Sequence, residues 1–202
     1  MEVIFELPAK AGSPIALTIG KFDGVHLGHR AVIERLRQNA SERQLPACAL
    51  TFDPHPIEYF LGERAPARLT ALPDKIRLLE SHGVDRLYVC PFTEVTASMS
   101  PEAFVCDVLV GQLGVRSLLV GEDFHFGARR GGDIATLRTL GSEVGFEVAT
   151  MEGFLVDGIR VSSTAIRAAI AKGDARSVRR FLGRNLFVPE CRSSVSEASG
   201  LK

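Results

Sequence analysis

Two histidines and three glycines within one short segment form the most unusual local pattern of the sequence. Residues 18–29 read TIGKFDGVHLGH, in which His26 and His29 have the spacing HxGH. The segment follows an apolar run and precedes an amphipathic stretch, so we expect it to join a strand to a helix. A helix start offers free N–H groups and a positive dipole end, and glycines permit close backbone approach. With imidazoles that titrate near neutral pH, the segment predicts a local cationic site for phosphate.

An isolated HxGH spacing has two other interpretations. It is more often an ordinary turn with two partly buried histidines than a ligand site. A zinc site would need a third and a fourth ligand, and the sequence offers no convincing candidate for them. The position of the pattern, directly after a buried strand, favours the phosphate interpretation.

A second segment with the residue types of a phosphate site is VSSTAIR, at 161–167. Ser162 or Ser163 is expected to cap the start of a helix, and Thr164 adds a third hydroxyl. Arg167 follows on the next turn, so hydroxyls, N–H groups and a guanidinium would meet at one helix end. An ordinary capped helix explains this segment equally well when it is considered alone.

The segment TFDPHP, at 51–56, ends an apolar run. Pro54 and Pro56 restrict the backbone and stiffen the exit, which would hold His55 and the carbonyl of Phe52 in place. Considered alone, a rigid turn that binds nothing is the simpler interpretation.

The segment GEDFHFG, at 121–127, follows another apolar run. Its two glycines bracket a tight excursion in which Phe124 and Phe126 alternate, so one or both could line a pocket for a ring. Phenylalanines near a strand end are more often part of the core.

Five short apolar runs alternate with amphipathic stretches along the chain. The expected strands cover residues 15–19, 47–52, 87–89, 117–120 and 146–150. The expected helices cover 30–43, 74–82, a segment that begins at 100–102, 133–144, a segment from 163, and 174–182. This alternation predicts an α/β fold with a doubly wound parallel sheet, in which ligands bind at the carboxyl ends of the strands. The four segments described above would then meet at one edge of the sheet.

The composition is that of a globular protein without a strong overall charge. Of 202 residues, 46% are hydrophobic, and 24 Lys+Arg balance 24 Asp+Glu, so we expect neither nucleic acid nor a membrane as a partner. Cys48, Cys90, Cys106 and Cys191 show no CxxC spacing, which argues against a zinc ribbon, and the first two are expected in the core. Without a signal sequence or an 18-residue apolar run, a cytoplasmic location is expected.

The four segments, in this order, resemble the motifs of the bacterial FAD synthetase family. GKFDGVHLGH (20–29) resembles the nucleotidyltransferase signature in which HxGH is a variant of HIGH, and TFDPHP, VGEDFHFG and VSSTAIR match in turn. The resemblance covers residues 13–184, and four ordered motifs are far more specific than one. It implies a Rossmann-like fold of the HIGH-motif nucleotidyltransferase type. It also implies an FMN adenylyltransferase, which joins the AMP of ATP to FMN and releases pyrophosphate.

The resemblance assigns a role to each motif, with ATP and FMN as substrates. The implied catalytic residues are His26, His29, Ser162, Ser163, Thr164 and Arg167. The implied ATP-binding residues are Gly20, Phe22, Asp23, Gly24, His26, Gly28, His29, Ser163 and Arg167. The implied flavin-binding residues are Phe52, Pro54, His55, Pro56, Asp123, Phe124, Phe126 and Gly127. Mg²⁺ is expected as a cofactor bound mainly through phosphates, with no protein ligand assigned.

The phosphate of FMN is already an anion, so it can attack the α-phosphorus of ATP in line without a protein nucleophile. The expected task of the protein is therefore positioning and charge stabilisation. His26 and His29 are assigned to the α- and β-phosphates, and the residues of VSSTAIR, the counterpart of a KMSKS loop, to the β- and γ-phosphates.

The sequence departs from the family's pattern at two places. Lys21 stands where asparagine is frequent, which adds a charge beside the expected triphosphate site. Asn185-Leu186-Phe187 stands where a proline–aromatic pair usually leads into a riboflavin kinase domain. We expect a transferase domain over 1–184 and a disordered tail over 185–202, with no riboflavin kinase domain and no identifiable partner protein.

Two other functions stay open at this point. The first is another small-substrate nucleotidyltransferase, such as a phosphopantetheine adenylyltransferase or a cytidylyltransferase. TFDPHP and GEDFHFG favour a flavin over those substrates. The second is a non-catalytic flavin- or nucleotide-binding remnant of a truncated bifunctional enzyme, which the joint presence of HxGH and SSTxIR disfavours.

Overall fold

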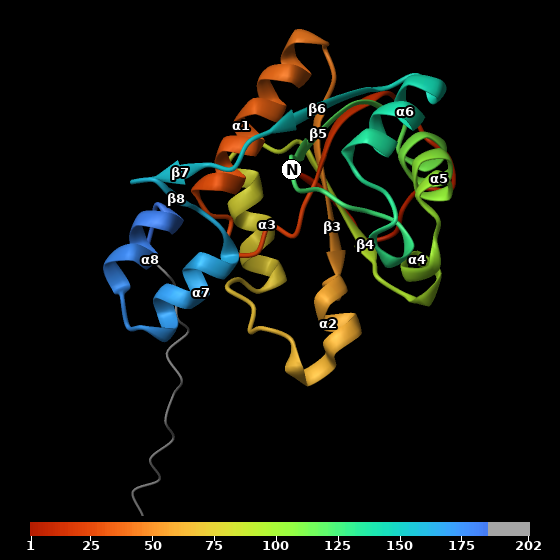
Figure 1. Ribbon diagram of the computed structural model, residues 1–202. Coiled ribbons are helices and arrows are strands. Elements are labelled where there is room, and N and C mark those ends of the chain that lie inside the picture. Colours follow the sequence, from red (N-terminus) through yellow and green to blue (C-terminus); the bar gives the residue numbers. More distant parts are fainter. Residues whose placement is uncertain (186–202) are drawn as a thin grey trace, which may run out of the picture.

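A parallel sheet of six strands forms the centre of the computed structural model, which describes residues 1–185 (Figure 1). The strands follow the order β1-β4-β3-β2-β5-β6 across the sheet. They are β1 (Glu2–Ile4), β2 (Ile15–Ile19), β3 (Ala47–Asp53), β4 (Arg86–Pro91), β5 (Val115–Gly121) and β6 (Glu147–Met151). The chain moves outward from β2 through β3 and β4, then returns to place β5 on the other side of β2. The predicted doubly wound parallel sheet is confirmed, with its switch point between β2 and β5.

Helices cover both faces of the sheet, as the strand pattern requires. One face carries α1 (Leu27–Glu42) and α3 (Leu72–Ser81), and the other carries α5 (Pro101–Ala103), the π-helix η2 (Phe104–Gln112) and α6 (Ile134–Val144). On β2, Ile15, Leu17 and Ile19 pack toward η2 and α6, whereas Ala16 packs toward α1. Both faces are therefore buried, which explains why the strands are continuous apolar runs.

Short elements extend the carboxyl edge of the sheet. They are α2 (Pro56–Leu61), η1 (Gly62–Arg64), α4 (Glu94–Ser98), η3 (Ala128–Arg130), and the hairpin of β7 (Leu155–Val156) and β8 (Ile159–Arg160). The last two helices are α7 (Ser163–Ala171) and α8 (Ala175–Leu182), shown in blue in Figure 1. Ile166, Phe181 and Leu182 form their shared core, which also packs against Leu27 at the start of α1. This contact fixes the start of α7 beside the start of α1.

The predicted strands and helices are confirmed to within a few residues. The sequence did not predict the short elements α2, η1, α4, η3 and the β7–β8 hairpin, nor that the helix expected from 100–102 continues as the π-helix η2. Helix α1 begins at Leu27 rather than Arg30, because the side chain of His26 accepts the N–H of His29 and caps the helix. Strand β1 was not predicted, since its three residues are too few for a periodic pattern. Cys48 and Cys90 are buried and free, as expected. The expected tail over 185–202 lies, beyond Asn185, outside the described residues.

Candidate functional site

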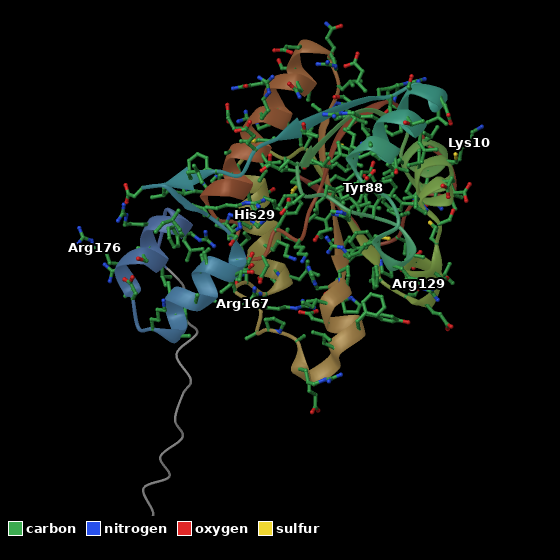
Figure 2. The ribbon with its side chains drawn as sticks, in the orientation of Figure 1. Lys10, His29, Tyr88, Arg129, Arg167 and Arg176 are labelled. Atoms are coloured by element: carbon green, nitrogen blue, oxygen red, sulfur yellow. The ribbon has the colours of Figure 1, made fainter. Side chains whose placement is uncertain are left out.

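The four unusual segments meet at one cleft of about 430 Å³, at the carboxyl ends of β2, β3 and β5 and the start of α7. The predicted residues that line it are Gly20, Phe22, Asp23, His26, Gly28, His29, Phe52, His55, Asp123, Phe124, Ser162, Ser163, Thr164 and Arg167. Figure 2 shows His29 and Arg167 on the same side of the molecule, although they come from opposite ends of the sequence. The predicted meeting of the four segments at one edge of the sheet is confirmed.

Five of the predicted residues do not line the cleft. They are Gly24, Pro54, Pro56, Phe126 and Gly127, none of which contributes to its wall. Gly24 is buried at φ +88° and its N–H is bonded to the hydroxyl of Thr70. Pro56 is the first residue of α2. These residues shape the loops around the cleft, and their predicted contacts with ATP or flavin stay predictions.

The two histidines of the first loop form a compact pair at the start of α1. Their rings are stacked with centroids 3.6 Å apart, and the edge of Phe22 packs against His29 at 5.3 Å. A Cβ on Gly28 would lie 3.1 Å from the His26 ring and 3.3 Å from the carbonyl oxygen of Val161. Glycine is therefore needed there, because the loop before α7 approaches the start of α1 too closely for a side chain.

The electrostatic state of this pair differs from the expectation. Burial, with the nearby charge of Arg184, lowers the pKa of His26 to about 4. Burial also lowers the pKa of His29 well below its usual value, and the charges of His26 and Lys75 add to the effect. The prediction that both imidazoles titrate near neutral pH is wrong for the folded chain, because removing them from water disfavours the charged form. The loop presents neutral imidazoles beside helix N–H groups.

The backbone of the same loop is held in an unfavourable conformation. Phe22 and Val25 have positive φ angles of 47° and 36°, although neither is glycine and Val25 is β-branched. Both side chains are fully buried in the core below α1 and α3. Packing thus maintains a strained loop, which is typical of binding and catalytic sites.

Asp23 connects the two segments that are expected to bind phosphate, the HxGH loop and VSSTAIR. Asp23 is 7% exposed, and one oxygen of its side chain accepts the N–H groups of Leu69 and Thr70 at 2.9 and 3.1 Å. The other carboxylate oxygen pairs with the guanidinium of Arg167 from α7. In addition, the hydroxyl of Ser163 donates to the backbone carbonyl of Asp23 at 2.8 Å. The carboxylate is therefore occupied by protein groups and positions Arg167.

The start of α7 has the geometry expected of a capped helix that faces a ligand. Ser162 is the N-cap, and its hydroxyl accepts the N–H of Ala165 at 3.1 Å. The Nε of Arg167 donates to the carbonyl of Ala67 at 2.8 Å, so the guanidinium is held from two sides. Ser162, Ser163, Thr164 and Arg167 all line the cleft opposite the histidine pair. Ser162 therefore caps the helix, as the simpler interpretation of VSSTAIR predicts, while the same segment also faces the cleft, as the phosphate-binding interpretation requires.

A second group of residues surrounds His55 at the end of β3. His55 caps α2 by accepting the N–H of Ile57 at 3.0 Å, and Glu58 accepts the N–H of His55 at 2.9 Å. Arg68 bridges Glu58 and Asp53, an arrangement that the sequence did not reveal. Burial and the charge of Lys21 lower the pKa of His55 to about 4. The ring is therefore neutral, with its position set by the capping bonds.

The two phenylalanines of the loop after β5 have different surroundings. Phe126 is 7% exposed in the core, where its ring stacks on Phe124 and packs at a tilt against Phe104. Phe124 is partly buried and lines the cleft. Asp123 pairs with Arg160 of β8 at 2.9 Å, so the hairpin contributes a cation that sequence reasoning missed. Of the two rings, only Phe124 is placed to contact a bound ring system.

Sequence reasoning also missed two cations near the histidines, Lys75, which is buried, and Arg184, which is partly buried. Lys75 of α3 lines the cleft with 6% of its surface exposed. Arg184, after α8, donates to the carbonyls of Gly24 and Val25 at 2.6 and 3.1 Å. The sequence contains a signal for Lys75, because this lysine lies one turn before Leu79, at a position of the helix where the amphipathic pattern predicts an apolar residue. Arg184 carries no such signal because its contacts span 159 and 160 positions of sequence.

Residues 1–185 contain neither a cluster of metal-ligating side chains nor a helix that could span a membrane. No group of three or more His, Cys, Asp or Glu side chains in this range could hold a metal ion. No helix in this range combines the length and the hydropathy that crossing a membrane requires.

Comparison with known proteins identifies the family. A model of the FAD synthetase family matches residues 9–165. The chain belongs to the FAD synthetase family. Three of its relatives are named bifunctional riboflavin kinase/FMN adenylyltransferase. The one from Escherichia coli K12 is 42% identical over 167 residues, the one from Haemophilus influenzae 45% over 169, and the one from Pseudomonas fluorescens 46% over 167. The matches cover 83%, 84% and 83% of this chain but 53%, 55% and 53% of the relatives.

This member of the FAD synthetase family thus spans about half the length of the curated relatives it matches. Its fold is also found in a crystal structure described as a macrolide-efflux protein from Streptococcus pneumoniae. The TM-score is 0.78 at 23% sequence identity, over 91% of this chain and 61% of that chain. At this identity the likeness supports the fold alone.

Proposed function

We propose that residues 1–184 are an FMN adenylyltransferase, which transfers AMP from ATP to FMN and releases pyrophosphate. One observation supports this most directly. The two segments expected to bind phosphate, HxGH and VSSTAIR, face the same cleft. They are connected by the ion pair of Asp23 with Arg167 and by the hydrogen bond from Ser163 to Asp23. A single polyphosphate between them would contact both. The names of the relatives include this activity.

The ATP half of the cleft is formed by the first loop and α7. We assign the α- and β-phosphates to His26, His29 and the free N–H groups at the start of α1. The β- and γ-phosphates are assigned to the hydroxyls at the start of α7 and to Arg167. Neutral imidazoles suit this task, because each donates one N–H to a phosphate oxygen without a prior proton uptake.

The flavin half is formed by the ends of β3 and β5. Phe52, His55 and Phe124 line this side of the cleft, and Asp123 lies at its rim with Arg160. An aromatic side chain beside polar groups is suited to a flat ring with polar edges. The isoalloxazine is assigned to this half, with the phosphate of FMN pointing toward the first loop.

The proposed reaction is an in-line substitution at the α-phosphorus of ATP. An oxygen of the FMN phosphate forms the new O–P bond, the bond from the α-phosphorus to the bridging oxygen breaks, and pyrophosphate leaves with the electron pair. No oxidation occurs, and the attacking anion needs no protein base. The residues act by positioning the two phosphates, which can lower the barrier by roughly 7–11 kcal/mol, and by stabilising the developing charge.

Mg²⁺ enters this proposal as the ion that accompanies ATP. In the described part of the chain, the carboxylates of Asp23, Asp53 and Asp123 are each paired with an arginine. These residues do not form an all-protein metal site. A hard cation that keeps its waters and binds through phosphate oxygens is compatible with the cleft. A cytoplasmic location, where ATP and FMN are available, is part of the same proposal.

The test is a direct assay of the purified chain with ATP, FMN and Mg²⁺. We expect FAD and pyrophosphate in equal amounts, separated by chromatography and measured by absorbance. Parallel reactions replace ATP by CTP, and FMN by riboflavin. Turnover with CTP but not ATP would indicate a cytidylyltransferase, and binding of FMN without any product would indicate a non-catalytic flavin-binding protein. Either result contradicts the proposal.

A further inference from the structure

Lys75 occupies a position where the fold calls for an apolar side chain. Helix α3 buries Lys75 and Leu79, four residues apart on the stripe that faces the sheet. Only 6% of Lys75 is exposed, less than for its neighbour Ile76, which is partly buried. A lysine at such a site departs from the amphipathic pattern of the helix, and departures of this kind concentrate at functional sites.

The ammonium of Lys75 has no counterion of its own. It makes no hydrogen bond and no ion pair within 4 Å with any residue that the structure describes. The carboxylates that act on it most strongly are those of Asp23, Asp53 and Glu58, and each is already paired with Arg167 or Arg68. Burial consequently lowers the pKa of Lys75. Most of the Lys75 side chain is buried, whereas its ammonium reaches the cleft. A largely buried lysine without a counterion is stabilised when an anion enters the cleft beside it.

The position of Lys75 in the cleft indicates where such an anion would lie. Lys75 lines the same cleft as His29 of the first loop and His55 at the end of β3, and its charge lowers the pKa of both. In both histidines one buried ring nitrogen, Nδ1 of His29 and Nε2 of His55, has no partner among residues 1–185. Lys75 therefore stands at the junction of the ATP half and the flavin half.

We propose that Lys75 binds the phosphate group of the acceptor, at the point where this group meets the α-phosphate of ATP. The proposal rests on the proposed function and identifies the residue that receives the attacking group. The triphosphate already has the start of α7 and Arg167 at its far end. Of the two lysines that line the cleft, Lys21 is an exposed residue, whereas Lys75 is a buried residue on a helix, so we assign the acceptor phosphate to Lys75. A lysine is suited to this task because its compact charge can contact oxygens of two phosphates at once.

The decisive measurement compares two flavins that differ only in the phosphate. Binding of FMN and of riboflavin to the full chain, without ATP, is followed by the quenching of flavin fluorescence. We expect Lys75→Met to weaken FMN binding by about 10- to 100-fold, the range for one charge-assisted contact. Riboflavin binding should change by less than about twofold, because riboflavin has no group for Lys75 to bind.

Two control variants make the comparison specific. Lys10→Met removes an exposed lysine that does not line the cleft and lies across the view in Figure 2 from His29 and Arg167, so it should change neither affinity. Lys75→Arg keeps the charge and should retain a preference for FMN over riboflavin. The midpoint of thermal unfolding of Lys75→Met should be equal to or above that of the wild type, because the variant removes a largely buried lysine without a counterion.

Three results would overturn the assignment. They are an unchanged FMN affinity in Lys75→Met, an equal loss of FMN and riboflavin affinity, and a wild-type protein that binds FMN no better than riboflavin. A lowered unfolding midpoint with equal loss of both flavins would identify Lys75 as a structural residue. Failure to make FAD would instead contradict the proposed function, and this binding comparison would still show whether Lys75 recognises a phosphate.

Discussion

Asp23→Asn tests whether one carboxylate holds the two halves of the ATP site together. The asparagine is of equal size and keeps an oxygen for the N–H groups of Leu69 and Thr70, but it loses the ion pair with Arg167. Breaking a buried pair costs about 3–5 kcal/mol when the remaining charge stays buried. The Arg167 side chain is 30% exposed and can be partly rehydrated, so we expect a loss of about 2–3 kcal/mol in the free energy of unfolding.

For a domain of this size, such a loss corresponds to a fall of about 5–10 °C in the unfolding midpoint. The assay is thermal unfolding followed by circular dichroism, with urea unfolding as an independent measure. Asp123→Asn is the matched control, because it breaks an exposed pair with Arg160 and should lower the midpoint by about 0–3 °C. Equal midpoints for Asp23→Asn and the control would refute the idea that Asp23 braces the site.

Three further predictions concern the histidines and the phenylalanines. His29→Ala should lower kcat by roughly 10²–10³-fold with the fold retained, and wild-type turnover would remove His29 from the mechanism. The folded pKa of His26, about 4, lies below its ordinary 6.5, so the unfolded chain binds more protons between these values. The contribution of His26 to the free energy of unfolding should therefore be complete above about pH 6.5. It should decrease toward pH 4 by up to about 1.4 kcal/mol per pH unit. Urea midpoints that stay constant from pH 7 to 5 would contradict this prediction. Phe126→Ala should lower the free energy of unfolding by about 3–5 kcal/mol. Phe124→Ala, at the cleft, should weaken FMN binding and lower the free energy of unfolding by less. Equal losses of the two variants in urea unfolding would contradict the different roles of the two rings.

The sequence was sufficient for the elements and their order because those depend on local patterns. Continuous apolar runs identified β2, β3 and β5, and their parallel arrangement followed from the intervening helices. The predicted cap at Ser162 is confirmed, and the helices expected from 100, 133 and 174 begin directly after Ser100, Asp133 and Asp174, whose side chains cap them. The motifs then met at one edge as the topology requires.

The sequence was insufficient where a side chain's environment depends on distant parts of the chain. The charge state of His26 and His29 depends on burial by α3 and on Arg184, which no local spacing reveals. Asp23 matched an ATP-binding motif, yet its partners come from residues 46 to 144 positions away. Phe124 and Phe126 have the same type and opposite roles, because only the packing of η2 distinguishes them.

A crystal structure of the chain with FMN and a non-hydrolysable ATP analogue is the most direct test of the whole account. The account predicts that the polyphosphate lies between the His26–His29 pair and the start of α7, with the phosphate of FMN beside Lys75 and facing the α-phosphorus. A polyphosphate bound away from either segment, or a flavin outside the cleft, would contradict it.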